Sequence, residues 1–456
     1  MDKIGPGPLN QKKHLTPLQF IVLGYLLFAL LGAVLLSLPF ALQPGVKINF
    51  IDALFTAASA VSVTGLTTVV IRNTFSLAGQ TILAFLIQFG GIGIMSLGTL
   101  FFIMRGNQIH LRERLMIRAD QNQMTLQGMV NLILFIFKVT ILFELLGALI
   151  LTFHFISIYH LPFLKALGIG LFHGISGFTN AGFDLFGNSL QDFQQDYIVK
   201  SVIGALLLAG SIGFPVLLEV YSNIRSWRKQ RKLRFSLYTK ITTITFGLLV
   251  IAGFIFIMLS EYTSGLAEMS WSQKIAVAFF QSLTARSGGF SSIDINVFSS
   301  STLLFLCLMM FIGASPSSCG GGIRTTTFAV LLLSLTAYVK GKTNVKVFQR
   351  ELYQEDIVKS LLVFFLAVML VVVSVIALSA IENFSSTEIL FEVCSAFGTT
   401  GLSMGISGEL SDAGKAIILT IMLIGRIGLI SLLLLFQARR PEDSFHYVKE
   451  HIIIGQ

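Results

Sequence analysis

Long apolar stretches with few charges alternate with short polar segments along most of the chain. A helix needs about 20 predominantly apolar residues to cross a bilayer, and eight stretches meet this need. They cover residues 18–38, 77–104, 128–153, 199–222, 241–260, 302–338, 360–381 and 416–436, the sixth with a break. The pattern predicts an all-α polytopic membrane protein with eight transmembrane helices. Because eight is even, both termini are expected on one side of the membrane.

The composition favours a membrane protein over a soluble one. Hydrophobic residues make up 54% of the 456 residues and charged residues only 12%, whereas a soluble domain has about 25% charged residues. The net charge of +9 does not indicate nucleic-acid binding, because so apolar a chain has no extended basic face for a phosphate backbone. Three cysteines at 307, 319 and 394 give neither a disulfide framework nor a metal-ligand spacing, so packing roles are expected.

The basic residues lie mainly on one side of the predicted spans. That side carries 22 Lys and Arg, in the two termini and the three even-numbered loops, against 7 on the other side and 3 within spans. The positive-inside rule then places both termini in the cytoplasm. The outer side carries 12 acids and a net charge of −5, and a negative mouth concentrates cations.

A four-fold internal repeat organises the chain. Between the two spans of each pair lies a short apolar segment that ends in Gly followed by Leu or Phe. The four endings read SVTGL, TNAGF, RSGGF and GTTGL, and their glycines are Gly65, Gly182, Gly289 and Gly401. A phenylalanine stands ten residues before each glycine, as Phe55, Phe172, Phe279 and Phe391. An Ile-Gly step follows in each second span, as Ile92-Gly93, Ile212-Gly213, Ile312-Gly313 and Ile427-Gly428.

Each repeat therefore consists of a helix, a re-entrant segment and a second helix. The predicted repeats are residues 17–105, 106–224, 225–340 and 341–437, with a cytoplasmic N-terminus at 1–16 and a cytoplasmic tail at 438–456. All four units enter from the same side, so an axis along the membrane normal relates them. Non-helical backbone at membrane depth persists only beside protein or water. The four re-entrant segments are therefore expected to converge on one central pore.

The ends of the re-entrant segments, here called the glycine loops, are typical of an ion filter. A filter replaces the hydration shell of an ion with backbone carbonyl oxygens, and glycine adopts the required positive φ cheaply. The preceding short helices aim partly negative C-terminal ends at the pore, which favours a cation. The predicted filter residues are Ser62, Val63, Thr64, Gly65, Thr179, Asn180, Ala181, Gly182, Arg286, Ser287, Gly288, Gly289, Gly398, Thr399, Thr400 and Gly401. Helix capping or close helix packing is the alternative, but capping alone does not explain the shared register.

The sixth span is interrupted by what we call the intramembrane segment, where a proline and three consecutive glycines break the helix. It comprises Gly313, Ala314, Ser315, Pro316, Ser317, Ser318, Cys319, Gly320, Gly321 and Gly322. A gap at membrane depth is costly unless it lines a cavity. A simple kink is the alternative, and a nucleotide-binding P-loop is disfavoured because the Gly-Lys-Ser/Thr ending is missing.

Arg426 lies alone in the last span, 11 residues from Lys415 and 13 from Arg439. At 1.5 Å per residue these charges are roughly 16 Å or more away, and an arginine that faces lipid at this depth is costly. Arg426 is therefore expected to face the pore, where its charge opposes cation passage, or to pair with an acid such as Glu144 or Glu219.

Arg286 precedes the third loop glycine by three residues. A positive side chain in the filter would oppose cations, so Arg286 is expected to brace the loop against an outer acid. A membrane-embedded enzyme is disfavoured, because HExxH, paired intramembrane aspartates and a Ser/His dyad on one helix are absent from the sequence. His173 lies on a re-entrant helix and is expected to be packed there.

These glycine signatures extend over nearly the whole chain and resemble those of the potassium uptake superfamily that includes the Trk, Ktr and plant high-affinity transporters. The closest resemblance is to the membrane subunits of bacterial Ktr potassium uptake systems. It implies potassium uptake across the bacterial plasma membrane, with K⁺ at the backbone carbonyls of the glycine loops. In that family a serine at the first loop glycine tends to accompany sodium selectivity, so Gly65 implies potassium. The resemblance also implies that the intramembrane segment and Arg426 form the gate.

The resemblance further implies a homodimer, with a pore in each protomer, and a separate cytosolic nucleotide-binding ring. The ring is expected to contact residues 105–120 and 446–456, while the basic residues at 225–234 meet anionic lipid. The chain has no nucleotide-binding fingerprint, so any ATP or ADP response would come from the partner. No cofactor is expected in this chain. Sodium coupling, a gated leak, and a sodium or ammonium transporter of the same fold stay open.

Overall fold

A computed structural model of the protein describes residues 16–105, 114–117, 128–227, 235–429 and 431–432. Within these residues, four helices are long and apolar enough to cross a membrane. They are α1 (Pro17–Leu36), α7 (Met129–Ser157), α11 (Leu237–Glu261) and α15 (Gln354–Ile381). Each is the first helix of a predicted repeat. Large apolar side chains such as Leu248 and Phe365 are more than half exposed on them, as on a surface that faces lipid.

A shorter helix follows each long one. The four are α2 (Phe50–Ser62), α8 (Phe163–Phe178), α12 (Trp271–Thr284) and α16 (Ser386–Gly398). Their 13 to 16 residues cover about 20 to 24 Å at 1.5 Å per residue, less than the ~30 Å hydrocarbon core. The last residues of all four are buried. The short helices therefore end inside the molecule, as expected for re-entrant segments.

The second span of each predicted repeat is broken. Helices α4 (Leu77–Ile92) and α5 (Ile94–Met104) part at Gly93, and α9 (Tyr197–Ser211) and α10 (Phe214–Trp227) are bent by 99°. The intramembrane segment separates α13 (Ser300–Phe311) from α14 (Thr325–Val339), and α17 (Asp412–Ile427) ends at Gly428. The prediction of continuous spans at 77–104, 199–222 and 416–436 is therefore wrong.

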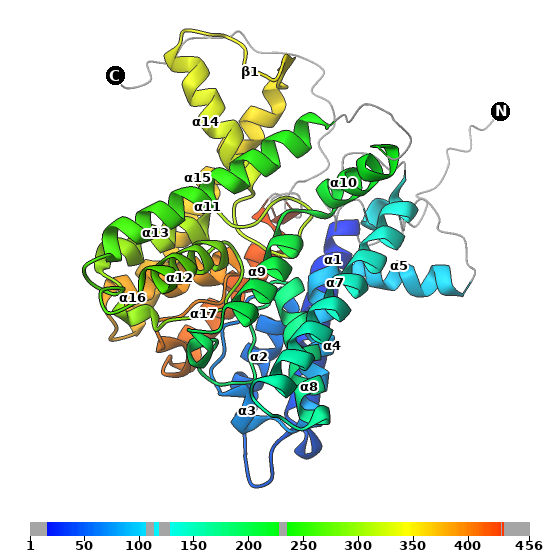
Figure 1. The fold of residues 1–456 in the computed structure, drawn as a ribbon. Helices are drawn as coiled ribbons and strands as arrows, with labels where there is room; N and C mark the ends of the chain where they lie inside the picture. Colours follow the sequence, from blue (N-terminus) through cyan, green and yellow to red (C-terminus); the bar gives the residue numbers. More distant parts are fainter. Residues whose placement is uncertain (1–15, 106–113, 118–127, 228–234, 430, 433–456) are drawn as a thin grey trace, which may run out of the picture.

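The Ile-Gly steps explain these breaks. Gly93, Gly213 and Gly428 have φ values of 97°, 100° and 90°, a conformation that ends a helix and that other residues rarely adopt. In the third repeat, α13 ends at Phe311, directly before the Ile312-Gly313 step. Figure 1 shows the result for the first repeat, where α5 turns away from the direction of α4. The step that marks the repeat is thus the point at which each second span stops.

The short helices pack in a cyclic order. Helix α8 contacts α4, α12 contacts α9, and α16 contacts α13, so each packs against a second-span helix of the preceding predicted repeat. Helix α2 contacts α17, which joins the first predicted repeat to the last. Across this contact, Nζ of Lys415 on α17 lies 2.7 Å from Oδ1 of Asp52 on α2. The chain therefore closes on itself around the ends of the short helices.

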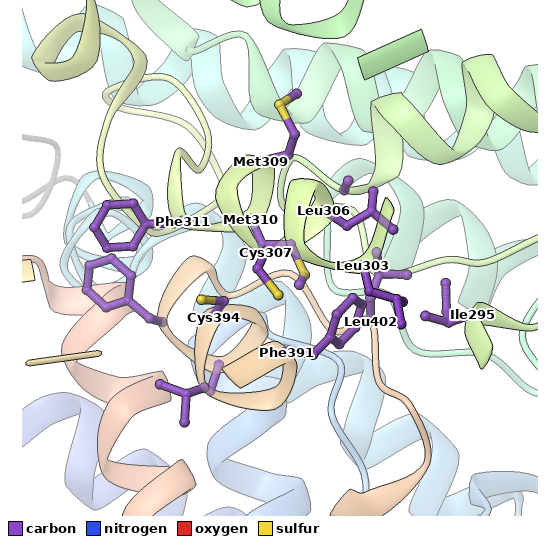
Figure 2. Packing of buried hydrophobic residues seen from close by; sticks show 14 of the residues in the cluster. Ile295, Leu303, Leu306, Cys307, Met309, Met310, Phe311, Phe391, Cys394 and Leu402 are labelled. Carbon is purple, nitrogen blue, oxygen red and sulfur yellow. The ribbon is translucent and has the colours of Figure 1, made fainter. Parts of the chain in front are cut away.

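Buried apolar side chains make these contacts. Figure 2 shows the contact between α13 and α16, where Cys307 and Met310 lie beside Phe391 and Cys394, all of them buried. The three cysteines are free and buried, which agrees with the packing role predicted for them. The contact fixes the fourth short helix against the helix that leads into the intramembrane segment.

Small elements complete the described chain. They are α3 (Ile71–Thr74), the 3₁₀ turns η1 (Pro39–Ala41), η2 (Gln191–Phe193), η3 (Ile295–Val297) and η4 (Ile406–Gly408), and an antiparallel pair of two-residue strands, β1 (Lys346–Val347) and β2 (Arg350–Glu351). The all-α prediction is corrected by this hairpin. The predicted tail at 438–456, nearly all of the N-terminus at 1–16, and most of the partner-facing loop at 105–120 lie outside the described residues.

Candidate ion-binding site

The four loop glycines lie next to one another. A Cβ atom placed on Gly182 would lie 2.7 Å from the Cα of Gly289, and one on Gly65 would lie 3.3 Å from the Cα of Gly182. A Cβ on Gly401 would lie 3.1 Å from Gly65 and 3.2 Å from Gly289. At each of the four positions the nearest backbone atom of another loop would lie only 2.2 to 2.7 Å from the added Cβ. Real Cβ contacts are essentially never this short, so each position has room only for glycine. Segments that are more than 100 residues apart in the chain thus form a closed ring.

The backbone of the glycine loops follows one pattern in all four copies. The glycines have φ values of 97°, 69°, 76° and 93°. The residues two positions earlier are also left-handed, with φ of 59° at Val63, 62° at Asn180, 70° at Ser287 and 45° at Thr399. Alternation of left-handed and ordinary residues turns successive carbonyl groups toward the same side, which is the geometry a carbonyl-lined ion site needs.

The second left-handed position was not predicted from the sequence. A positive φ is uncommon outside glycine and is most disfavoured for β-branched residues such as Val63 and Thr399. Of the four, only Asn180 is of a type enriched in this conformation, so the residue types gave no shared signal for it. All four residues are at most 1% exposed, so they pack inside the protein.

Hydrogen bonds tie each glycine loop to the end of its own short helix. The backbone N–H groups of Thr64, Ala181 and Thr400 donate to carbonyls of the fifth residue back, at 2.8 to 2.9 Å. Two side chains add a further bond, because Ser59 Oγ accepts from Gly65 N at 3.0 Å and Ser395 Oγ accepts from Gly401 N at 3.1 Å.

The second and third loops use different side-chain bonds. The Ser176 hydroxyl, in the second repeat, donates to the carbonyl of Phe183 at 2.8 Å instead. The third loop has Leu283 at this position and is braced by Arg286. That side chain is buried and donates to the carbonyls of Phe246 at 3.0 Å and Gly313 at 2.9 Å, and its guanidinium lies 4.2 Å from the Phe246 ring. The prediction of an outer acid as its partner is wrong, because the hydrogen bonds of the guanidinium go to carbonyl oxygens, and its Nε has no partner among the described residues.

The intramembrane segment packs against the break between α9 and α10. Ser315 N donates to the carbonyl of Ser211 at 3.1 Å, and Cys319 N donates to that of Gly210 at 3.1 Å. In return, Phe214 N donates to the carbonyl of Ser317 at 2.8 Å. Two half-buried polar side chains hold the segment further: the Tyr238 hydroxyl donates to Pro316 O at 2.8 Å, and Arg324 donates to the carbonyls of Ser315 and Gly320.

The three consecutive glycines of this segment lie directly against the glycine loops. A Cβ on Gly320 would lie 2.7 Å from the Cβ of Ser287, and one on Gly321 would lie 2.6 Å from the Thr399 side chain. A Cβ on Gly322 would lie 3.2 Å from the Cα of Gly398. The segment therefore packs against the third and fourth loops, and the triple glycine allows this close approach.

Arg426 is buried and bonds to this same region. Its guanidinium donates to the carbonyl of Cys319 in the intramembrane segment, and to the carbonyls of Gly90 and, at 3.0 Å, Gly91 at the end of α4. The expected acids bond elsewhere, because Glu144 accepts from Gln88 at 3.1 Å. Arg426 thus joins the last predicted repeat to the first and third through backbone carbonyls.

Two other residues singled out in the sequence, Glu219 and His173, lie within the fold, away from the glycine loops' own hydrogen bonds. Glu219 accepts from Ser236 N at 2.6 Å at the start of α11. His173 is fully buried, with Nδ1 2.8 Å from the Ile169 carbonyl and its ring stacked on Phe186, which agrees with the packed role predicted for it. In the described part of the chain, no three or more His, Cys, Asp or Glu side chains lie close enough together to hold a metal ion.

Known proteins that are similar to this chain show the family to which it belongs. The TrkH family of cation transport proteins matches residues 19–447. Ktr system potassium uptake protein D of Bacillus subtilis is 49% identical over 441 residues, which cover 97% of this chain and 98% of that protein. Potassium/sodium uptake protein NtpJ of Enterococcus hirae is 36% identical over 451 residues, with 97% and 98% covered.

A second Bacillus subtilis relative, Ktr system potassium uptake protein B, is 37% identical over 442 residues, with 96% of this chain and 97% of that protein covered. The crystal structure of the potassium transporter TrkH from Vibrio parahaemolyticus matches with a TM-score of 0.72, covering 94% of this chain and 86% of that chain. At 19% identity that match shows a shared fold. On the family match and these identities, the chain belongs to the TrkH family of cation transport proteins.

Proposed function

We propose that this protein is the membrane subunit of a potassium uptake system, in which K⁺ crosses the plasma membrane between the four glycine loops. The observation that carries the proposal is the closed ring of Gly65, Gly182, Gly289 and Gly401, each with positive φ and in contact with the next. The potassium uptake function named for two relatives supports the choice of ion. The family is one of transporters, so no enzymatic activity is proposed.

The proposed filter works through backbone carbonyls. A dehydrated K⁺ needs several oxygen ligands at once, and four loops with the same alternating backbone supply them in rings. The short helices direct their partly negative C-terminal ends to the same place, which stabilises a cation there. No bound cofactor takes part in this account.

The cyclic packing supports an arrangement of four repeats around one pathway. Counting each broken second span as one crossing, the chain would cross the membrane eight times, with each repeat entering from the cytoplasm. The proposed boundaries at 105/106, 224/225 and 340/341 fall between these units. The excess of Lys and Arg in the even-numbered loops and termini supports cytoplasmic termini.

The proposed gate is the intramembrane segment together with Arg426. The segment packs directly against two of the glycine loops, so we place it next on the path of an ion that leaves the filter. Arg426 holds the segment by its Cys319 carbonyl and places a positive charge near the path, which opposes a cation. Conduction then requires that the segment move aside.

Regulation is proposed to come from outside this chain. The Ktr system names of two relatives imply a further component, and we assign the nucleotide response to a cytosolic ring that binds a homodimer of this subunit. Sodium is a second candidate as coupling or transported ion, because one relative is a potassium/sodium uptake protein.

Ion uptake by cells that lack their own potassium import tests the proposal. Cells that express this chain with its partner are expected to take up Rb⁺ in preference to Na⁺ and ammonium. Gly182→Ala places a methyl group 2.7 Å from the Gly289 backbone and is expected to lower Rb⁺ uptake more than about tenfold. Gly98→Ala is the matched control, since nothing lies within 4 Å of its added Cβ. Preferential Na⁺ uptake would contradict the potassium assignment and favour the sodium alternative.

A further inference from the structure

The Ser287 side chain lies between the proposed filter and the proposed gate. It belongs to the third glycine loop and is fully buried. Its Oγ lies 2.9 Å from the carbonyl oxygen of Thr399 and 3.2 Å from that of Gly398, both in the fourth loop. The same Oγ accepts the backbone N–H of Gly321, in the intramembrane segment, at 3.3 Å. One hydroxyl thus bonds both functional parts at once.

The chemistry of a hydroxyl makes these bonds depend on each other. Serine has one proton to donate and two lone pairs to accept with. The proton is directed to the nearest acceptor, the Thr399 carbonyl, while the Gly321 N–H occupies a lone pair. With that N–H in place, the hydroxyl cannot rotate freely. If the segment withdrew, the hydroxyl would lose this restraint, and the Thr399 carbonyl would lose a fixed donor.

The equivalent residues in the other loops lack this link. Val63 has no polar side chain, and the side-chain N and O of Asn180 have no hydrogen-bond partner. Thr399 Oγ1 lies 3.3 Å from Ser287 Oγ, and no bond joins it to the segment within the described residues. The link is therefore specific to the third loop, next to the place where Arg286 bonds Gly313 at the start of the segment.

We propose that Ser287 is a positioning residue that couples the intramembrane segment to the ion filter. With the segment under the filter, Ser287 holds the Thr399 carbonyl, and the fourth loop is kept in one arrangement. When the segment moves aside, that carbonyl is released toward the ion, so gating and ion binding change together. The proposal rests on the proposed function of the glycine loops and the segment.

Cys319 offers a direct reporter, because it lies in the segment and is fully buried. Replacing Cys307 and Cys394 by alanine leaves Cys319 as the one thiol in the chain. The rate at which a maleimide modifies Cys319 in the purified full-length protein then measures how often the segment is displaced. This rate does not depend on transport, so a failure of the proposed function would show separately, as missing Rb⁺ uptake.

Two variants remove the hydroxyl in different ways. Ser287→Ala keeps a Cβ, whereas Ser287→Gly also relieves the positive φ of 70° and so protects against a failure to fold. Both are expected to raise the modification rate about tenfold, which corresponds to one lost hydrogen bond. Ser334→Ala, which removes a hydroxyl that bonds the Val330 carbonyl within α14, is expected to change it less than about twofold.

A second measurement distinguishes coupling between the filter and the intramembrane segment from a general loosening of that segment. In protein with the Ser287 hydroxyl, exchange of Na⁺ for K⁺ in the buffer is expected to change the rate at which the maleimide modifies Cys319, because the filter and the segment are linked. In both Ser287 variants this ion dependence is expected to be lost. The proposal is overturned if the rate stays unchanged in both variants, or if the ion dependence persists in them.

Discussion

Some residues of the glycine loops adopt a backbone conformation that costs free energy. Val63 and Thr399 are β-branched and have φ values of 59° and 45°, and such a conformation costs roughly 1 to 3 kcal/mol per residue. It persists because neighbouring bonds determine it, for example those from Thr64 N to Ser59 O and from Thr400 N to Ser395 O. The strain therefore falls on the residues that would face the ion with their carbonyls.

Replacement of Arg426 tests the gate at the residue scale. Arg426→Ala removes the bond to the Cys319 carbonyl and a positive charge near the path, so K⁺ flux into liposomes that carry this subunit alone is expected to rise about tenfold. Lys138→Ala is a suitable control, since Lys138 is an exposed charge on the predicted third span. Equal flux in the wild type and Arg426→Ala would show that Arg426 has only a structural role.

Some functional residues could be predicted from the sequence, but the hydrogen-bond partners of the two arginines could not. The loop glycines were predictable because glycine recurs in register and alone tolerates the close contact with the next loop. The partners of Arg286 and Arg426 were not predictable, because both bond to carbonyl oxygens, and every residue has one. A buried arginine in a sequence suggests an acid, while only the folded backbone shows which carbonyls are within reach.

At the scale of elements, the broken second spans are the feature that the hydropathy pattern concealed. Apolar residues continue through the breaks in the first, second and fourth predicted repeats, so the pattern alone favours one long helix there, whereas the break in the third was predicted from its proline and glycines. The Ile-Gly step was visible as a repeat marker, but an isolated glycine is tolerated inside many helices. Its effect became clear only from the positive φ at Gly93, Gly213 and Gly428.

A pair of glycine substitutions tests this account of the breaks. Gly93→Ala forces a Cβ into a positive φ of 97° and is expected to lower the stability by about 1 to 2 kcal/mol. Gly98→Ala lies within α5 with open space around it, and it is expected to raise the stability by up to about 1 kcal/mol through helix propensity. Thermal unfolding in detergent measures both, and equal effects would contradict the account.

Helix α9 begins with a carboxylate cap, Asp196, whose charge is expected to make the stability of the folded protein depend on pH. Asp196 Oδ1 accepts from Ile198 N at 3.0 Å and Val199 N at 3.1 Å, and Oδ2 pairs with His154 at 2.5 Å and accepts from Tyr159 at 3.0 Å. Burial acts to raise the pKa of Asp196, but the bonds from His154, Val199 and Tyr159 outweigh it and lower the pKa below its usual value. Burial and the bond to Asp196 raise the pKa of Tyr159 to about 12, so it stays a neutral donor.

A carboxylate with a lowered pKa stabilises the folded state above its unfolded pKa of about 4, and this stabilisation is lost as the pH falls through the folded value. Asp196→Asn keeps a capping side chain without the charge. The wild type is expected to be more stable than this variant by about 1 kcal/mol at pH 6, and the difference should vanish toward pH 2. A difference that does not change with pH would contradict the charged cap.

At the scale of the whole molecule, the contact between the first and last predicted repeats decides whether the chain forms a ring. The Lys415 and Asp52 side chains are 10% and 14% exposed, so loss of one partner leaves a largely buried charge. Lys415→Met is expected to lower the stability by about 2 to 3 kcal/mol.

The matched control for this change is Lys359→Met. It breaks a pair with Glu355 whose side chains are 58% and 85% exposed, and it is expected to cost less than about 1 kcal/mol. Adding Asp52→Asn to Lys415→Met should recover part of the loss, because the unpaired acid is removed. No recovery would show that the ion pair does not join the two repeats.

The mostly helical, membrane-spanning character of the chain could be predicted from its hydropathy. Four copies of one register implied four equivalent hairpins, which stay a prediction, and the structure shows that α2, α8, α12 and α16 pack in a cyclic order. The residues alone suggested that the triple glycine breaks a helix, and the resemblance implied a gate, but neither indicated that these glycines contact the third and fourth loops. Contacts between distant segments depend on the folded geometry, which a local pattern does not contain.

Anomalous diffraction from crystals grown with Rb⁺ in place of K⁺ locates the transported ion. We expect anomalous density on a central axis, enclosed by the carbonyl groups of residues 62–65, 179–182, 286–289 and 398–401. Density that lies elsewhere in the membrane, with none inside this ring in protein that transports Rb⁺, would contradict the proposed filter.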